Sequence, residues 1–444
     1  MQLHKAERQI FVCSALNGIT DILIETGKNA SVPDKMQKGI GEYTDRHMKI
    51  INEIFKDSAE YKKLAIDFMN EKIKELKKVL QEIQEFGPEL YFMDYTISFG
   101  EKLSTYLLYL FVKMKSYPVE YIIGEDIIIT DSNFGNSLPI WDMTRNRIRK
   151  TFVPKINDQN NKTIFCVTGF TGRNKLGYTT TLGRGGSDFT ATIIARSLYD
   201  ECNDKNIRVV LWKDVDGILS TNPKYVKEPR LLKVLNYDEA KEMAFYGAKI
   251  LHPKCLFGLD ERHIPVEIRN FDKPDAKDIY SVINDQSEPT DITGISTIED
   301  VALLAITSGS LVSTPGVLAK IFALMGAADI NVSLVAQSSS EVNTTFIVEK
   351  ADGDRALKLI TTDNYFKGWA QVELRYVSIL AITGKGISKS MVQAKIFESL
   401  AMENINIIAM AQSSDGLNLS MVLNKDHVAR AVGLINECQK CTKM

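Results

Sequence analysis

An internal repeat occupies the last third of the chain. Residues 319–343 align with residues 394–418 at a constant offset of 75, and the matches include Ala-Lys-Ile-Phe, Ile-Asn and Ala-Gln-Ser-Ser. Identities on one register across a helix, a turn and two strands indicate a duplicated structural unit. We therefore predict two similar small modules after about residue 290.

Each copy is predicted to run strand, helix, strand, strand, helix. The first copy continues into a strand near 371–374, whereas the second copy ends without a final strand and leaves an unpaired edge. Residues 294–298 could fill that edge, which would interleave the modules; the alternative is a shortened second module. The predicted domains are 1–290, 291–370 and 371–444. The predicted elements are 301–307, 315–327, 330–336, 342–349 and 354–361 in the first copy, and 377–383, 389–403, 405–411, 417–423 and 426–437 in the second.

The first 290 residues alternate apolar strands with helices. This alternation is typical of an α/β fold with a mainly parallel sheet covered on both faces. Ligands bind such sheets beyond the carboxyl ends of the strands. The predicted strands are 8–15, 127–130, 163–168, 207–212 and 264–269, and the clearest helices are 66–83, 188–202 and 237–247.

The composition excludes several classes of protein. The chain has 444 residues, is 44% hydrophobic and carries a net charge of −2, so disorder and a nucleic-acid or anionic membrane partner are not indicated. It has no apolar run long enough for a membrane span and no apolar signal core, and we expect a cytoplasmic protein. The six cysteines are scattered, and we expect neither a disulfide framework nor a metal site.

A glycine-rich segment precedes the helix predicted at 188–202. Residues 183–188 read Gly-Arg-Gly-Gly-Ser-Asp, in which glycines allow close approach of the backbone to a ligand and Arg184 offers a planar fork for a carboxylate or phosphate. The alternative is a tight turn with Ser187 or Asp188 as helix cap. Residues 167–175 do not form a Walker A motif.

Other candidate residues are weak when taken singly. Glu101 is expected at the start of a helix, where an acid often only compensates the helix dipole. Asp214 follows a predicted strand in Asp-Val-Asp-Gly, and these acids could contact ribose, a metal or a turn amide. Lys249 could contact a phosphate or simply lie on the surface.

Taken in order, these segments resemble the aspartate kinases of the amino acid kinase family. The resemblance covers nearly the whole chain and implies a three-layer αβα kinase domain followed by two ACT-like βαββαβ modules. The matching segments are Ser14-Ala-x-x-Gly-Ile-Thr-Asp21, Ser98-Phe-Gly-Glu101, Val167-Thr-Gly-Phe170, Thr180-Thr-Leu-Gly-Arg-Gly-Gly-Ser-Asp188, Asp214-Val-Asp-Gly217 and Gly247-Ala-Lys-Ile-Leu-His-Pro253.

The resemblance implies ATP-dependent phosphorylation of L-aspartate to 4-phospho-L-aspartate, the first step of lysine, threonine and methionine biosynthesis. It implies that Arg184 pairs with the α-carboxylate of aspartate, that Glu101 lies near the amino group, and that Asp188 organises a catalytic lysine. Mg²⁺ would accompany ATP. The implied aspartate site comprises Thr20, Glu101, Arg184, Gly185, Gly186 and Ser187, and the implied nucleotide site comprises Lys213, Asp214, Leu219, Lys224, Lys249 and Ile250.

The chain departs from the family pattern at two places. The family opens with a strand carrying Lys-Phe-Gly-Gly-Thr-Ser, whose lysine neutralises the transferred phosphate, and the printed sequence has no such segment. We expect that translation naturally starts upstream; the alternative is true loss of the lysine. Three positions of the nucleotide region also differ. Where the family has Thr-Asp, this chain has Lys213-Asp214, and where the family has tyrosine, it has Leu219. The family's Asp-Pro-Arg is replaced by Asn-Pro-Lys at 222–224.

The repeated modules suggest regulation by an end-product amino acid, either lysine or threonine. Gln337, Ser340, Glu341 and Asn343 offer polar groups for such an effector, while the matching run in the second copy is interpreted as a turn. We expect a homodimer or homotetramer formed through the modules. Two alternatives are a catalytically impaired, amino-acid-sensing binding protein and a kinase of another small carboxylate.

Overall fold

The computed structural model describes residues 8–158, 160–202, 205–246, 251–276, 279–288, 290–307, 315–338, 343–368 and 370–441. The chain divides into two compact units. The first contains Met1–Leu211 and Lys254–Glu267, and the second contains Trp212–Pro253 and Ile268–Met444. In the described part of the chain, no helix is both long and apolar enough to cross a membrane.

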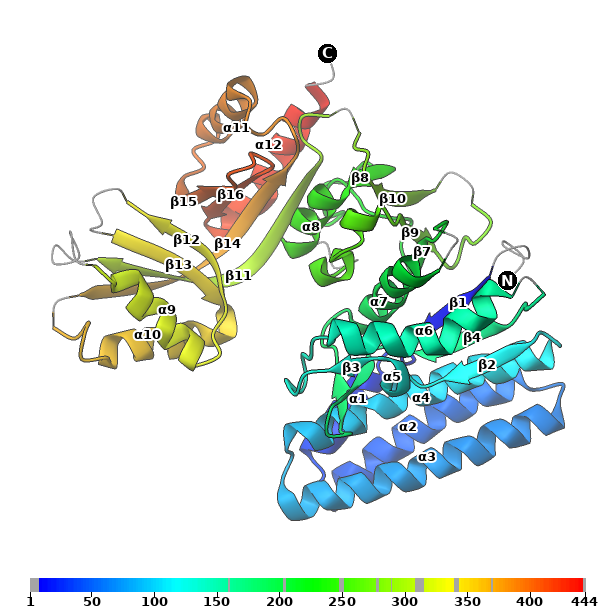
Figure 1. Cartoon of the computed structure of the whole chain (residues 1–444). Coiled ribbons are helices and arrows are strands. Elements are labelled where there is room, and N and C mark those ends of the chain that lie inside the picture. Colours follow the sequence, from blue (N-terminus) through cyan, green and yellow to red (C-terminus); the bar gives the residue numbers. More distant parts are fainter. Residues whose placement is uncertain are drawn as a thin grey trace. The chain divides into compact units, whose positions relative to one another are not determined.

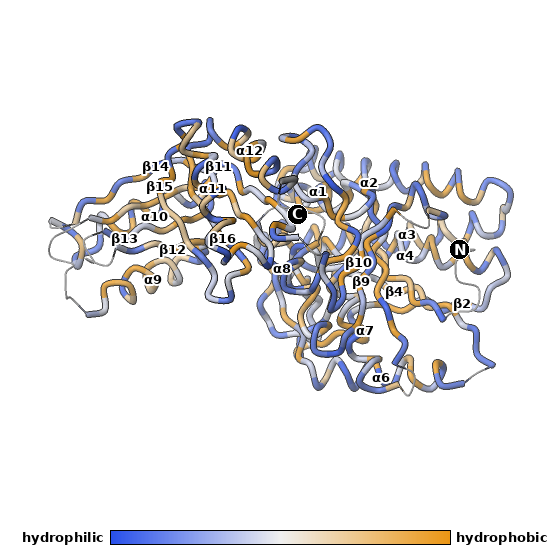
Figure 2. The backbone as a smooth tube through the Cα atoms, turned by 90° about the horizontal axis from the view of Figure 1, so that it is seen from above, coloured by the Kyte–Doolittle hydropathy of each residue, from blue (hydrophilic) through white to orange (hydrophobic). Residues whose placement is uncertain are grey.

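Long helices form one layer of the first unit. Figure 1 shows α2, α3 and α4 lying alongside one another, and Figure 2 shows hydrophobic and hydrophilic stretches alternating along α2. The helix predicted at 66–83 is confirmed as the central part of α3, which begins after a Ser58 cap and ends at Gly87 with φ 91°. The helices of this layer are α1 (Ile19–Lys28), α2 (Pro33–Ile54), α3 (Ala59–Phe86) and α4 (Leu90–Met114).

A parallel sheet in the order β1-β4-β2 lies between helices. Phe165 of β4 packs against Phe152 of α6, while its neighbour Cys166 packs with Leu108 of α4. Successive side chains of a strand point to opposite faces, so the sheet is covered on both sides, as the sequence predicts. The elements are β1 (Ile10–Cys13), β2 (Val119–Ile122), β4 (Ile164–Thr168), α6 (Trp141–Asn157) and α7 (Gly186–Glu201).

A small second sheet, β3-β5-β6, completes the first unit. The predicted strand 127–130 is wrong in its first half, because Ile127 ends the short helix α5 and only two residues form β3. A short run of buried isoleucines fits a strand and a helix equally well, so the pattern could not decide. The elements are α5 (Gly124–Ile127), β3 (Ile129–Thr130), β5 (Thr171–Asn174), β6 (Thr179–Thr181) and the 3-10 helices η1 (Pro253–Leu256) and η2 (Asp260–Arg262).

A four-stranded sheet in the order β7-β9-β10-β8 precedes the repeat. The helix predicted at 237–247 is confirmed as α8, which begins with a capping box formed by Asn236 and Glu239. The predicted strands 207–212 and 264–269 are confirmed with shifts of one or two residues. The elements are β7 (Val209–Lys213), β8 (Val234–Asn236), α8 (Tyr237–Phe245), β9 (Val266–Asn270) and β10 (Tyr280–Asn284).

The repeated modules share one six-stranded sheet, in the order β12-β13-β11-β14-β16-β15. Helices α9 and α10 pack on the strands of the first module, and α11 and α12 pack on the strands of the second. The elements are β11 (Gly294–Thr307), α9 (Val317–Ala327), β12 (Val332–Gln337), β13 (Asn343–Glu349), η4 (Lys350–Asp352), α10 (Gly353–Thr362), β14 (Gln371–Thr383), α11 (Ser390–Met402), β15 (Ile407–Gln412), β16 (Asn418–Leu423), η5 (Lys425–His427) and α12 (Val428–Cys441).

The modules are interleaved through β11 and β14. Gly294 to Ile298 pair with Thr383 to Ile379, which belong to the second module, whereas Val301 to Thr307 pair with Val377 to Gln371 in the first. The register shifts between Ile298 and Val301. Residues 294–298 therefore supply the strand that the second copy lacks, as the unpaired-edge argument predicts.

Candidate functional site

The carboxyl ends of β1 and β4 meet the N-terminus of α7 in the first unit. The Gly169 N–H donates to the Cys13 carbonyl at 2.9 Å. A Cβ at Gly169 would lie 2.7 Å from the Ser187 side chain and 2.8 Å from the Cys13 carbonyl oxygen. Glycine is therefore required where the helix start approaches the strand ends this closely.

The glycine-rich turn opens α7 without a side-chain cap. Gly183 and Gly185 have φ values of 71° and 70°, and Gly185 is the N-cap. The alternative that Ser187 or Asp188 caps the helix is wrong, because both lie within its first turn. Arg184 is exposed, whereas Ser187 and Asp188 are half-buried. This arrangement places the N-terminus of α7 beside the strand ends, with Arg184 in the turn before it, and such a combination suits an anion.

Glu101 lies in the interior of α4, so its expected place in a first helical turn is wrong. The side chain is 3% exposed, and Oε1 accepts the Ala15 N–H at 3.1 Å. Oε2 is buried and has no hydrogen-bond partner among the described residues. Burial, assisted by the nearby Glu125 charge, raises the pKa of Glu101 to about 8. A buried carboxyl oxygen without a partner is costly unless a ligand supplies a donor.

Close packing of α4 places Glu101 at the end of β1. A Cβ at Gly100 would lie 2.7 Å from the Ala15 Cβ, so only glycine lets the helix approach this segment. One turn further, Ser104 Oγ donates to the Ser14 carbonyl at 2.7 Å. The segment continues to Thr20, which is half-buried and is the second residue of α1. The ends of β1 and β4 are thus surrounded by three segments: the segment after β1 that leads to Thr20, α4 with Glu101, and the start of α7.

Sequence reasoning missed a buried ion pair beside Glu101. Lys102 Nζ lies 2.9 Å from Glu125 Oε1. The two residues are 23 positions apart and follow no local pattern. The sequence offered only one sign of the pair, which is a lysine within an apolar helix segment. With Lys72, Glu75 and other residues, the pair lines a polar cavity of about 280 Å³.

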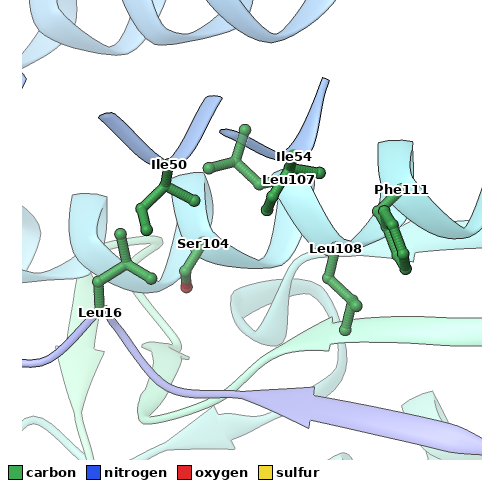
Figure 3. A pocket seen from close by; sticks show the side chains of 7 residues that line it. All are labelled: Leu16, Ile50, Ile54, Ser104, Leu107, Leu108 and Phe111. Carbon is green, nitrogen blue, oxygen red and sulfur yellow. The ribbon is translucent and has the colours of Figure 1, made fainter. Parts of the chain in front are cut away.

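A second cavity is almost entirely apolar. Its volume is about 230 Å³, and Figure 3 shows Ser104 as its sole labelled oxygen-bearing side chain among aliphatic and aromatic groups. Its lining comes from the segment after β1, from α2 and from α4: Leu16, Ile50, Ile54, Ser104, Leu107, Leu108 and Phe111. This cavity does not offer the charged groups that an amino-acid substrate needs.

The predicted nucleotide residues lie in the second unit where they are described. Lys213 ends β7, and the exposed Asp214 follows it. Leu219 forms an isolated bridge with Leu231. Lys224 pairs with both carboxylate oxygens of Glu299 at 2.9 and 3.0 Å, a residue at the β11 register shift. The Lys249 and Ile250 predictions lie outside the described residues.

The predicted effector residues are described only in part. Gln337 ends β12 and donates to Thr344 Oγ1 at 3.2 Å, while Asn343 begins β13 and is exposed. Ser340 and Glu341 lie outside the described residues. In the second copy, Gly416 has φ 71° and Asp415 accepts the Leu417 N–H at 3.0 Å, which confirms the turn interpretation there.

Two family models match the chain, one before the repeat and one within each of its copies. The model described as the amino acid kinase family matches residues 2–270. The model described as an ACT domain matches residues 304–363 and 380–439. Within the described residues, no group of three or more His, Cys, Asp or Glu side chains could hold a metal ion.

Curated relatives carry aspartokinase names. The bifunctional aspartokinase/homoserine dehydrogenase of Haemophilus influenzae is 27% identical over 97% of this chain and 52% of its own length. Aspartokinase 2, chloroplastic, of Arabidopsis thaliana is 27% identical over 96% of this chain and 77% of its own length. The chain thus spans about half the length of the bifunctional relatives that it matches.

Solved structures share the fold. E. coli aspartokinase III in complex with aspartate and ADP has a TM-score of 0.82 at 23% identity, covering 97% of this chain and 92% of the other. The same enzyme in complex with lysine and aspartate has a TM-score of 0.76 at 22% identity, covering 98% and 93%.

Proposed function

Because this chain belongs to the amino acid kinase family, we propose that it uses ATP to phosphorylate L-aspartate to 4-phospho-L-aspartate. The observation that carries the proposal is the buried Glu101 Oε2 at the ends of the β1 and β4 strands, for which the described residues supply no donor. An α-ammonium group supplies that donor and a compensating charge. The aspartokinase names of the curated relatives support the same substrate.

The remaining groups of the first unit match the other parts of an aspartate molecule. The exposed Arg184 guanidinium offers two parallel donors to the α-carboxylate. The backbone at Gly185 and Gly186, with the hydroxyls of Ser187 and Thr20, supplies further hydrogen bonds. Catalysis then consists of positioning the β-carboxylate for attack, because phosphoryl transfer needs alignment and charge stabilisation more than covalent help.

ATP would bind with Lys213, Asp214, Leu219, Lys249 and Ile250. Mg²⁺ would accompany its phosphates and neutralise part of their charge. Lys224 is the further candidate cation for this site, and its pairing with Glu299 must open if it contacts a phosphate. Asp188, in the first turn of α7, would organise a catalytic lysine.

The direct test is coupled measurement of ADP release from MgATP with and without aspartate. It is run on the 444-residue chain and on a chain extended by the residues encoded in frame upstream. Aspartate-dependent turnover in either form supports the proposal. Folded protein that is silent in both forms contradicts it and favours the amino-acid-sensing alternative.

The KM for aspartate is expected to depend steeply on pH. Burial raises the pKa of Glu101 to about 8, so the carboxyl is mainly protonated below that value, whereas ammonium binding needs the carboxylate. Below pH 8, KM should rise about tenfold for each unit of decreasing pH, and above pH 8 it should level off. Initial rates between pH 6 and 9 measure the profile, and a flat KM would contradict the assignment of Glu101.

Feedback by lysine or threonine is proposed for the ACT modules, with control of the lysine, threonine and methionine pathway. Gln337, Ser340, Glu341 and Asn343 are the candidate effector residues. The solved E. coli complex with lysine supports an amino acid of this class.

A homodimer or homotetramer formed through the ACT modules is also proposed. Sedimentation at micromolar concentration should give a mass of two or four times 49.8 kDa. A monomer under these conditions would contradict it.

A further inference from the structure

Lys102 and Glu125 form a buried ion pair that the proposed chemistry does not yet use. Lys102 directly follows Glu101 on α4, and Glu125 lies on α5. Their side chains are 10% and 8% exposed, with Nζ and Oε1 2.9 Å apart. A buried pair of this kind is weak evidence for stability, because desolvation offsets most of the attraction. Its main effect is therefore on the geometry of the segments that it joins.

The pair is embedded in a hydrogen-bond network from several elements. Lys102 Nζ also donates to Ser98 Oγ at 3.0 Å and lies 4.8 Å from the centroid of the Tyr95 ring. Glu125 Oε2 accepts a hydrogen bond from Thr171 Oγ1 at 3.1 Å. The network thus ties one turn of α4 to α5 and β5, and such connected networks favour one arrangement of the groups that they join.

This network fixes the direction in which Glu101 points. Consecutive residues on a helix are separated by a constant rotation of about 100°. Holding the Lys102 side chain against Glu125 therefore sets the rotation of Glu101. The Tyr121 hydroxyl strengthens the tie because it donates to the Lys102 carbonyl at 3.1 Å.

We propose that Lys102 and Glu125 are a positioning pair for the ammonium group of the substrate, acting through Glu101. The pair holds α4 in the rotation that directs Glu101 toward the strand ends, and it keeps the charge next to Glu101 balanced. This inference rests on the proposed function, because it assumes that Glu101 receives an ammonium group.

Tyr43, Cys13 and His47, which lie on the α2 and β1 side of Glu101, are uncharged between pH 6 and 9. Burial raises the pKa of Tyr43 and Cys13 and lowers that of His47 to about 4. Of the charged groups in the described part of the chain, Glu125 raises and Lys102 lowers the pKa of Glu101. The surroundings comprise Tyr43 with His47 against its ring on α2, Cys13 and the Ala15 amide at the end of β1, Lys102 on α4 and Glu125 on α5.

The test compares Lys102→Met, Glu125→Gln and the double variant. Aspartate KM, kcat and dissociation constants are measured between pH 6 and 9. The E125Q variant leaves an unbalanced cation, so the KM profile should move to lower pH and the KM at pH 6 should fall about threefold to tenfold. The K102M variant should move the profile to higher pH and raise the KM at pH 7 about tenfold. The double variant removes both charges, so the midpoint of its KM profile should return to the wild-type pH. Its aspartate KM should nevertheless be raised at every pH, because the contact between α4 and α5 is lost.

Glu75→Gln is the matched control. Glu75 lines the same cavity and pairs with Lys72 at 2.6 Å, but it lies on α3. Its removal should leave the aspartate KM and the midpoint unchanged. If K102M does not fold, E125Q and the charge-preserving Glu125→Asp still decide the question, since E125D should retain the wild-type midpoint.

Two negative results are distinguishable. If the wild type turns over aspartate and every variant raises KM by a constant factor without moving the midpoint, the pair is only a structural tie and the inference is overturned. If the wild type neither binds nor phosphorylates aspartate in calorimetry and turnover assays, the proposed function itself fails, and the role of the pair fails with it.

Discussion

Glu101→Gln is expected to raise the KM for aspartate at least about a hundredfold at pH 8, because the amide removes the charge opposite the ammonium group. The change keeps the shape of the side chain, and the amide oxygen can still accept the Ala15 N–H. The nucleotide residues lie in other segments, so the dissociation constant for MgATP should not change. Calorimetry with each ligand and initial-rate kinetics measure the two effects separately.

The same variant should change the pH dependence of stability. The pKa of Glu101 is about 8 in the folded protein against 4.5 in the unfolded chain, so the folded state binds its proton more tightly. The free energy of unfolding should therefore fall as pH rises from 4.5 to 8, by on the order of 4–5 kcal/mol from this group. The E101Q variant should lose this contribution and be more stable than the wild type at pH 8.

Denaturant titrations at pH 5 and pH 8 measure this difference. The exposed Glu85→Gln on α3 is the control and should behave like the wild type in binding and in stability. An E101Q variant with unchanged aspartate affinity would exclude Glu101 from the ammonium site. An unchanged pH slope would show that its carboxyl is not buried as described.

Local patterns predicted most of the fold, because each element carries its own hydrophobic period. The repeat located both modules, and the missing final strand of the second copy pointed to residues 294–298. The pattern failed at Ile127, where buried isoleucines suit a helix end as well as a strand. It also failed at Glu101, which was expected at the start of a helix but lies in the interior of α4.

The geometry of the site depended on contacts that no local pattern carries. Asp94 is partnered by Thr181, 87 residues away, and Lys102 by Glu125 on a different helix. The motifs therefore indicated the candidate residues, whereas the Glu101 oxygen that no described residue contacts, and the network beside it, follow only from the three-dimensional structure.

Asp94→Ala is expected to lower the free energy of unfolding by about 3–5 kcal/mol, because it leaves three donors without an acceptor, two of them buried. Asp94 is 2% exposed, and its Oδ2 accepts the N–H groups of Gly135 at 2.9 Å and Thr181 at 2.7 Å. Its Oδ1 accepts the Thr181 hydroxyl at 2.9 Å. The residue thus clamps α4 to the end of β6, immediately before the glycine-rich turn. Loosening this clamp should also weaken aspartate binding, because α4 carries Glu101.

Urea denaturation of the two proteins measures the loss of stability. Asp142→Ala is the matched control, since it removes a carboxylate that is 91% exposed and pairs with Arg145 at 3.2 Å. Its effect should stay within about 0.5 kcal/mol, as is usual for surface pairs. Asp94→Asn should fall between the two, because the amide keeps one acceptor but turns a donor toward N–H groups. A D94A variant as stable as the wild type would show that water or neighbouring groups satisfy these donors, and that α4 is held at the site by other contacts.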